Sequence, residues 1–227
     1  MIAPKLAKAS YYMTSSGNKD ERINKLNNSI AHTGFKAIKD KSNRDIVYYE
    51  NPNLKQTYNA HRGTDIHGKK AKADLTADVS YILGLEKHNK EFKKRANKTN
   101  QLIKSVNPNH EVFLTSHSYG SASVHHTLEN KKDVLNRISK SYAYNPLTSP
   151  FHNANVSKDK QKKLNDKVEV HRINADIVSE PGYSYGITKT YKPKDNLKLP
   201  KQIPEHSQKT FDTIQQLKTH SLDNFMN

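Results

Sequence analysis

A serine between a short apolar run and a run of small residues is the first candidate for chemistry in this sequence. The apolar run is Glu111–Thr115, and Ser118 is the centre of the pentapeptide Ser116-His117-Ser118-Tyr119-Gly120 that follows it. A serine nucleophile sits in a sharp strand–turn–helix, usually written G-x-S-x-G, whose flanking small residues let strand and helix approach closely. Ser116 takes the place of the first glycine here. The pentapeptide is therefore compatible with a nucleophile, or with a polar turn in which Ser118 caps a helix.

A serine nucleophile needs a base, and the base needs a carboxylate that orients it. In one large class of serine hydrolases these residues come in the order Ser, Asp, His. Downstream of Ser118, Asp176 follows a strand-like run, and His206 and His220 come after it. His206 lies in a polar segment where we expect it to be solvated. His220 lies in the terminal run THSLDNF, so we assign Asp176 as the orienting carboxylate and His220 as the base.

Acyl transfer also needs hydrogen-bond donors for the oxyanion of the tetrahedral intermediate. The backbone N–H of Tyr119, directly after the candidate nucleophile, is one such donor. The second should come from an earlier strand end, and the run His61-Arg62-Gly63-Thr64 is the best candidate. Gly63 lets the backbone turn, and Thr64 offers both an N–H and a hydroxyl. We therefore expect Thr64 and Tyr119 to form an oxyanion hole.

The elements that must position these residues alternate along the chain. Ile23, Leu26 and Ile30 share one face of a predicted helix, and an Asn-Pro-Asn turn joins two strands of a predicted hairpin. Such alternation predicts an α/β fold, a mostly parallel central sheet with helices on both faces and the chemistry at the carboxyl ends of its strands. The predicted helices are Lys19–Ile30, Ala71–Leu83, Glu86–Val106 and one beginning in Ser121–Val124; the predicted strands are Asp45–Glu50, Leu54–Ala60, Glu111–Thr115, Ser141–Tyr144 and Val168–Ile173. Thr64, Ser118, Asn145 and Asp176 all follow strand ends and should converge.

Six motifs in order resemble the class 3 lipase family. They are HRGTD, D-x-x-x-D-V, SHSYG, AYNP, ADIVS and HSLDNF, and they extend from His61 to Phe225. The resemblance implies an α/β-hydrolase fold, hydrolysis of glycerolipid acyl esters, and no required cofactor or metal. It implies the nucleophile, orienting and base roles for Ser118, Asp176 and His220, and the oxyanion hole of Thr64 and Tyr119. It also implies structural roles for Arg62 and Asp78, and a packing and hydrogen-bonding role for His117.

Two departures from the family pattern remove no catalytic atom. His61 replaces an apolar residue, and Ser116 and Ser121 replace flanking glycines. We predict an N-terminal helical and polar extension over 1–42, packed on an α/β-hydrolase domain over 43–227. The predicted function is a serine hydrolase that cleaves carboxylic esters of lipids, either phospholipid or acylglycerol. The alternative is a lipase-fold structural or binding component, for example of a virion, with weak activity or none.

The composition excludes several kinds of site for this chain. Its 227 residues contain 38 Lys and Arg against 22 Asp and Glu, a formal net charge of +16, and no cysteine. The absence of cysteine excludes disulfides, cysteine-based zinc sites and a cysteine nucleophile. No apolar run is long enough to span a membrane and no signal peptide is recognisable, so we expect a soluble, cytoplasmic or virion-associated protein.

The positive charge favours anionic partners. No helix-turn-helix, zinc-finger, RRM or KH signature is present, so we expect no specific nucleic-acid binding. Lys69, Lys70 and Lys72 follow the predicted oxyanion strand and either favour an anionic lipid surface or form a solvated run of charges. The adjacent pair His125-His126 does not share a helix face, and we assign it no metal. The expected partners are thus a lipid substrate and an anionic membrane surface.

Overall fold

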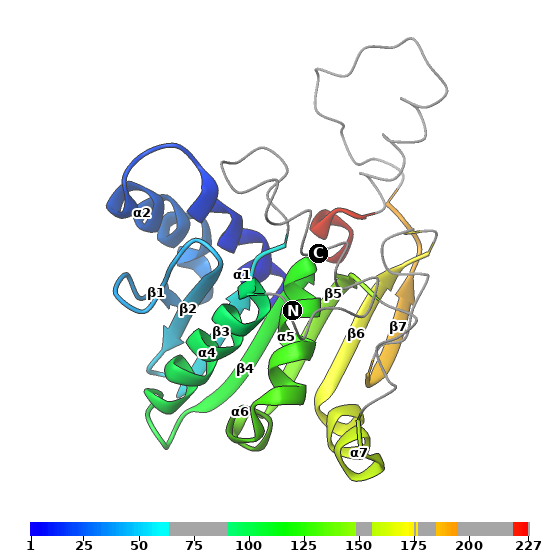
Figure 1. Ribbon diagram of the computed structural model, residues 1–227. Helices are drawn as coiled ribbons and strands as arrows, with labels where there is room; N and C mark the ends of the chain where they lie inside the picture. Colours follow the sequence, from blue (N-terminus) through cyan, green and yellow to red (C-terminus); the bar gives the residue numbers. More distant parts are fainter. Residues whose placement is uncertain (64–89, 149–155, 175, 177–184, 195–219, 227) are drawn as a thin grey trace.

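A mostly parallel sheet forms the centre of the molecule (Figure 1). The computed structural model describes residues 1–63, 90–148, 156–174, 176, 185–194 and 220–226. Within these residues, β1 to β3 pair in antiparallel fashion and β3 to β7 in parallel, with neighbours in sequence order. The strands are β1 (Lys36–Ala37), β2 (Ile46–Asn51), β3 (Gln56–His61), β4 (Glu111–Ser118), β5 (Lys140–Pro146), β6 (Val168–Ile173) and β7 (Ile187–Tyr191).

Helices cover both faces of this sheet, and alternate residues of β2, β4 and β5 enter the two cores on its opposite faces. Phe113 of β4 joins the core beneath the N-terminal helices, whereas its neighbours Val112 and Leu114 join the core on the other face. The first face carries α1 (Ala3–Ala9), η1 (Ser10–Thr14), α2 (Lys19–Ile30) and η2 (Ala31–Thr33); the second carries α4 (Lys90–Lys104), α5 (Tyr119–Asn130), α6 (Lys132–Arg137) and α7 (Lys158–Lys167). A short 3₁₀ helix, η4 (Leu222–Phe225), comes near the end of the chain. The predicted α/β class, a mostly parallel central sheet with helices on both faces, is confirmed.

The predicted helix over residues 19–30 is confirmed, and its start has a local cause. The Asn18 side chain accepts a hydrogen bond from the Glu21 N–H, and the Glu21 carboxylate accepts one from the Asn18 N–H. This capping box satisfies two donors that a helix start leaves open. The buried residues of the helix are Ile23, Leu26 and Ile30, the same three that the helical periodicity predicts.

The predicted hairpin is also confirmed, with Tyr49 opposite Tyr58 in an antiparallel register. Strand β4 continues beyond the predicted Thr115 as far as Ser118, and α5 begins at once with Tyr119. Helix α4 lies within the predicted helix over 86–106, while the predicted helix over 71–83 lies outside the described residues. Four elements have no apolar pattern that predicts them: β1 is two residues long, β7 has four exposed residues out of five, and α6 and α7 are short and rich in lysine or polar residues.

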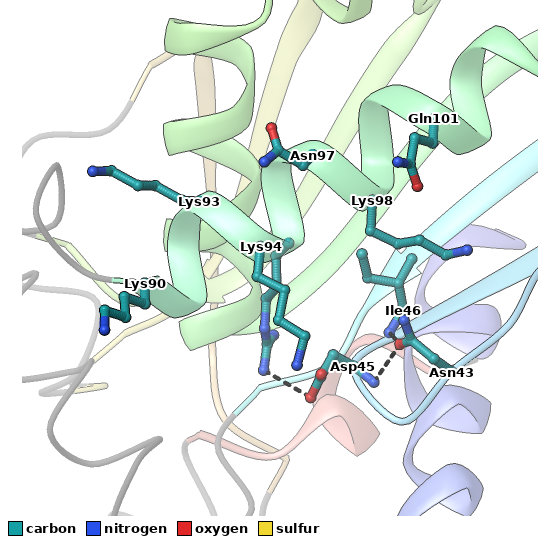
Figure 2. A pocket seen from close by; sticks show the side chains of 10 residues that line it. Asn43, Asp45, Ile46, Lys90, Lys93, Lys94, Asn97, Lys98 and Gln101 are labelled. Atoms are coloured by element: carbon teal, nitrogen blue, oxygen red, sulfur yellow. Dashed lines mark hydrogen bonds and ion pairs between the residues drawn. The ribbon is translucent and has the colours of Figure 1, made fainter.

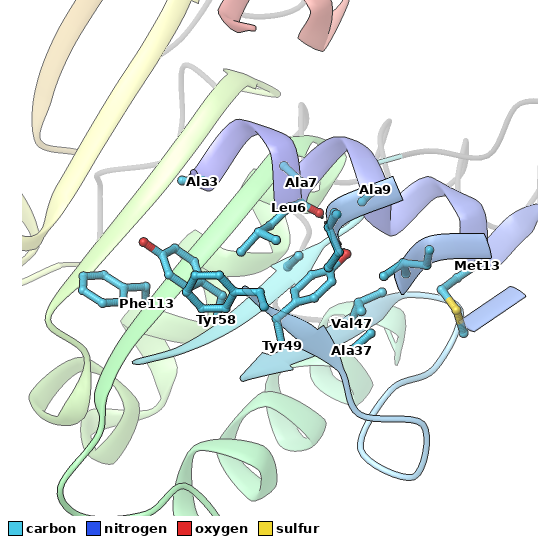
Figure 3. Close-up of a cluster of buried hydrophobic side chains, with 14 of the residues drawn as sticks. Ala3, Leu6, Ala7, Ala9, Met13, Ala37, Val47, Tyr49, Tyr58 and Phe113 are labelled. Atoms are coloured by element: carbon cyan, nitrogen blue, oxygen red, sulfur yellow. Dashed lines mark hydrogen bonds between the residues drawn. The ribbon is translucent and has the colours of Figure 1, made fainter. Parts of the chain in front are cut away.

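The N-terminal segment supplies a large part of one core (Figure 3). Figure 3 shows Leu6 directed from α1 towards Tyr58 on the sheet. Two side-chain hydroxyls of the sheet form hydrogen bonds to backbone carbonyls of this helix. Tyr49 Oη donates to the Leu6 carbonyl at 3.0 Å, and Thr115 Oγ1 donates to the Ala3 carbonyl at 3.0 Å. The first turns of the chain are therefore built into the face of the sheet beside β4. None of the described helices is long and apolar enough to cross a membrane.

Candidate active site

Ser118 has the backbone conformation of a nucleophile elbow. It ends β4 with φ 53° and ψ −130°, one of three non-glycine residues with positive φ in the described chain. A side-chain-bearing residue in this region stores strain of about 1–3 kcal/mol, and such strain is found most often at functional sites. Ser118 is also the residue before α5, yet its side chain makes no capping hydrogen bond. The interpretation of Ser118 as a helix cap is therefore wrong, and the strained strand–turn–helix agrees with the nucleophile interpretation.

The residues two before and two after Ser118 explain how strand and helix come so close. A Cβ on Gly120 would lie 2.3 Å from the His61 carbonyl oxygen and 2.8 Å from that of Arg62. Glycine is therefore the residue type that fits where α5 passes the end of β3. Ser116 is fully buried, and its hydroxyl donates to the Tyr142 carbonyl at 3.3 Å. The serine that replaces the usual first glycine is thus accommodated by β5, and it does not prevent the elbow.

Asp176 and His220 form a hydrogen-bonded pair. The Nδ1 of His220 lies 3.0 Å and 3.1 Å from the two carboxylate oxygens of Asp176. Asp176 is fully buried, whereas the His220 side chain is 19% exposed. A carboxylate at Nδ1 selects the tautomer that carries its proton there, which leaves Nε2 free to accept a proton. This is the arrangement that an orienting carboxylate and a general base require.

Ser118 and His220 belong to neighbouring parts of the structure. The ring of His117, directly before Ser118, lies 4.7 Å from the ring of His220 in a tilted arrangement, and its Nε2 donates to the His220 carbonyl at 2.8 Å. Among the described residues, no hydrogen bond joins the Ser118 hydroxyl to the His220 imidazole. Such bonds are often long before substrate binds and shorten in the reacting complex.

Asn145 connects the strand ends that carry the acidic and nucleophilic residues. It has φ 39°, and its side-chain oxygen accepts a hydrogen bond from the Ile173 N–H at 2.8 Å. Ile173 ends β6, and its carbonyl accepts the Asp176 N–H at 3.2 Å. Two residues after Asn145, the Leu147 N–H donates to the Ser118 carbonyl at 3.2 Å. The predicted convergence of Asn145, Ser118 and Asp176 therefore holds, with Asn145 in a supporting place.

The predicted oxyanion loop reaches Ser118 through Gly63. A Cβ on Gly63 would lie 3.0 Å from both the Ser118 Cβ and the His117 carbonyl oxygen. The Gly63 N–H already donates to the Tyr11 hydroxyl at 3.1 Å, so it is not an oxyanion donor in this arrangement. Tyr119 begins α5, where backbone N–H groups and the helix dipole favour negative charge. Thr64, the other predicted donor, lies outside the described residues, as do Asp78, His206 and the lysines 69, 70 and 72.

A buried ion-pair cluster holds this loop against the elbow. Arg62 donates to the Gly63 carbonyl at 2.6 Å and lies 3.5 Å from the Asp45 carboxylate. Arg95 donates to the Arg62 carbonyl at 2.9 Å, lies 3.3 Å from Asp45, and stacks its guanidinium 4.7 Å from the centre of the Tyr119 ring. Arg62 and Arg95 thereby connect the predicted oxyanion loop to Tyr119, the residue that follows Ser118. The structural role expected for Arg62 agrees with these contacts.

Two buried histidines flank the site as neutral side chains. Burial, and then the nearby His220, lower the pKa of His117 from 6.5 to about 3. Burial, and then the Arg95 charge, lower the pKa of His61 from 6.5 to about 3. His61 is hydrogen-bonded to the Thr99 hydroxyl at 3.1 Å, so the histidine that replaces an apolar residue has a polar partner in α4. Both rings serve packing and hydrogen bonding, as expected for His117.

Among the known structures that resemble this chain are three of fungal lipases. A fungal lipase–inhibitor complex, described as a model for interfacial activation, has 16% identity and a TM-score of 0.43 over 84% of this chain and 81% of that chain. Two complexes of Rhizomucor miehei lipase with its propeptide each have 15% identity. The deletion mutant gives a TM-score of 0.40 over 84% of this chain and 67% of that one, and the native form 0.37 over 78% and 63%. No protein-family model and no curated protein matches the sequence.

A separate, basic cavity lies beside α4 (Figure 2). Its volume is about 540 Å³, and Figure 2 shows Lys90, Lys93, Lys94 and Lys98 projecting from that one helix. Its described lining includes Asp45 and Arg95 but none of the three predicted catalytic residues. Within the described part of the chain, no group of three or more His, Asp or Glu residues could hold a metal ion.

Sequence reasoning missed Tyr11, whose hydroxyl contacts both Gly63 and His117. Tyr11 and His117 are 106 positions apart, so no motif spacing connects them. The available signal was the spacing of Ala3, Leu6 and Ala7, which predicts an apolar helix face in the N-terminal segment. That face would have added to the predicted packing of residues 1–42 which residues of the segment face the sheet.

Proposed function

We propose that the protein is a serine hydrolase that cleaves carboxylic esters of lipids, either phospholipid or acylglycerol. The observation that carries the proposal is the strained Ser118 elbow on the same edge of the sheet as the Asp176–His220 pair. The geometry supports acyl transfer, and the lipid substrate follows from the motif resemblance to class 3 lipases. All chemical groups that the reaction needs are side chains or backbone N–H groups, so the proposal includes no cofactor.

In the proposed reaction the Ser118 Oγ attacks the ester carbonyl carbon while His220 Nε2 takes the hydroxyl proton. Asp176 holds the imidazole in the correct tautomer and stabilises its cationic form. The Tyr119 N–H and Thr64 donate to the oxyanion of the tetrahedral intermediate. When this intermediate collapses, the alcohol leaves with the proton from His220 and an acyl-enzyme remains. Water then repeats the sequence, and the free acid leaves Ser118.

The test is labelling of the purified protein with a fluorophosphonate probe, which reacts with activated serines. Ser118→Ala should abolish labelling with its circular dichroism spectrum unchanged. Ser123→Ala, which removes another serine from the start of α5, is the matched control and should label as the wild type does. Labelling followed by turnover of a lipid ester panel would support the proposal. Full labelling or esterase activity in Ser118→Ala would overturn the assignment of the nucleophile.

A folded wild type that does not label would favour the second candidate function, a structural or binding component with a lipase fold. The same probe thus separates the two candidates, because a binding component has no need for an activated serine.

We further propose that the protein acts at an anionic membrane surface. The chain has a formal net charge of +16, and four lysines of α4 surround one cavity. Arg95 connects this cavity to the elbow, because its guanidinium lies against the Tyr119 ring. Each lysine close to an anionic leaflet contributes about 1 kcal/mol of attraction. An anionic surface at α4 would therefore bring lipid close to the candidate active site.

Vesicle sedimentation tests this partner. Binding to phosphatidylcholine vesicles should rise when phosphatidylglycerol is added, and should weaken with salt. The triple variant Lys93→Gln, Lys94→Gln and Lys98→Gln should bind the anionic vesicles at least tenfold less tightly. The control removes three charges from α7, which packs against β6 instead, by the changes Lys158→Gln, Lys162→Gln and Lys163→Gln. Equal loss in both variants would show that net charge, and not the surface of α4, decides binding.

A further inference from the structure

A hydrogen-bonded chain runs from the N-terminal segment to the candidate catalytic histidine. The Gly63 N–H donates to the Tyr11 hydroxyl at 3.1 Å, and that hydroxyl donates to His117 Nδ1 at 2.7 Å. The Nε2 of His117 then donates to the carbonyl of His220 at 2.8 Å. His220 in turn donates from its Nδ1 to Asp176. The Tyr11 hydroxyl accepts one hydrogen bond and donates one, and each ring nitrogen in this chain is either a donor or an acceptor.

The direction of these bonds is determined by chemistry. A carbonyl oxygen only accepts, so His117 must carry its proton on Nε2 to bond the His220 carbonyl. A neutral ring with its proton on Nε2 can only accept at Nδ1, and the Tyr11 hydroxyl is the donor there. Burial lowers the pKa of His117 to about 3, which keeps the ring in this neutral form. The Tyr11 hydroxyl thereby selects the one tautomer that can hold the backbone of His220.

The same hydroxyl reaches both sides of the nucleophile. On one side it accepts the N–H of Gly63, whose backbone lies against Ser118. On the other side it orients the ring that holds the His220 backbone. Tyr11 itself is half-buried in η1, and the ion pair between Lys8 and Asp223 connects the same segment to η4, directly after His220. The N-terminal segment therefore contacts the oxyanion loop, the nucleophile strand and the histidine loop at once.

The geometry points to Tyr11 as a positioning residue for acyl transfer, acting through His117 to hold His220 and through Gly63 to hold the oxyanion loop. This inference rests on the proposed hydrolase function. It assigns the first turns of the chain a supporting role at the active site, exerted through His117 and Gly63. We therefore predict that loss of the Tyr11 hydroxyl, with the aromatic ring retained, slows the chemical step and does not change substrate binding.

The experiment compares Tyr11→Phe with Tyr49→Phe. The Tyr49 hydroxyl also fastens the N-terminal helix, through the Leu6 carbonyl, but it belongs to a strand and bonds neither His117 nor Gly63. Tyr11→Phe should lower kcat for a p-nitrophenyl ester, and the fluorophosphonate labelling rate, about tenfold with KM within a factor of two. Tyr49→Phe should lower stability without changing kcat. In the background of His117→Ala, Tyr11→Phe should lower kcat by a smaller factor than in the wild type, because only its hydrogen bond to Gly63 is then left to lose.

A spectroscopic measurement decides the inference without any activity. The Nδ1 proton of His220, shared with Asp176, should exchange with water about tenfold faster in Tyr11→Phe than in the wild type, as seen by NMR of protein with ¹⁵N-labelled histidine. Unchanged kcat and unchanged proton exchange in Tyr11→Phe would overturn the inference. So would equal effects of Tyr49→Phe, or additive effects of Tyr11→Phe and His117→Ala. A wild type that neither labels nor hydrolyses esters would instead refute the hydrolase proposal, and the proton exchange alone would then decide the role of Tyr11.

Discussion

Replacement of Ser118 by glycine should make the fold more stable than replacement by alanine, although both changes remove the proposed nucleophile. Ser118 holds φ 53° and ψ −130°, a conformation that glycine adopts readily and residues with a Cβ do not. The stored strain is about 1–3 kcal/mol. Glycine also loses more backbone freedom on folding than alanine. This entropy cost reduces the stabilisation from relieved strain by roughly 0.5–1 kcal/mol. The expected advantage of Ser118→Gly over Ser118→Ala is therefore roughly 0.5–2 kcal/mol of unfolding free energy.

The assay is urea unfolding monitored by circular dichroism. Both variants are fitted with the same slope of unfolding free energy against urea concentration. Ser123 provides the matched comparison, because it is a serine inside the first turns of α5. There, replacement by glycine should be less stable than replacement by alanine by roughly 0.5–1 kcal/mol, the opposite sign. If Ser118→Gly is no more stable than Ser118→Ala, the elbow is not strained and the argument from its backbone fails.

Three further outcomes are expected. Gly120→Ala should lower the unfolding free energy by about 1–3 kcal/mol in urea unfolding, because its Cβ would lie 2.3 Å from the His61 carbonyl oxygen; equal or higher stability would show that α5 has room to move. Asp176→Asn should lower kcat by about 10⁴, measured with a p-nitrophenyl ester, because an amide in place of the carboxylate favours the wrong histidine tautomer; a loss under tenfold would contradict the assigned role. The free energy of unfolding should be highest above pH 6.5 and should fall as the pH drops from 6.5 towards 3. The fall should be roughly 1 kcal/mol per pH unit for each of His61 and His117, because these histidines bind a proton in the unfolded chain and not in the folded chain. His61→Gln should make this slope shallower in denaturation series at several pH values, and an unchanged slope would refute the buried neutral form.

Local patterns in the sequence were sufficient for several elements of the fold. Asn18 and Glu21 cap α2 through contacts within one turn, and the residues that it buries follow from helical spacing alone. The hairpin of β2 and β3 likewise depends on one turn and on neighbouring residues. The candidate site could be predicted for a related reason. The chemistry restricts Ser118, Asp176 and His220 in type and in order, and a parallel sheet brings strand ends to one edge.

Contacts between distant segments decided what local patterns could not. Whether Ser116 can replace a glycine depends on the room beside β5, and the need for glycine at position 120 depends on the carbonyls of β3. The edge strands β1 and β7 have too few buried residues to produce a pattern, because sheet pairing supplies their hydrogen bonds. Tyr11 lies beside His117 because the N-terminal helices pack on the sheet. The sequence by itself thus determined which residues could do the chemistry and in what order, since those choices are local. The tertiary structure alone decided which distant side chains hold them in place, because hydrogen bonds across the fold leave no spacing in the chain.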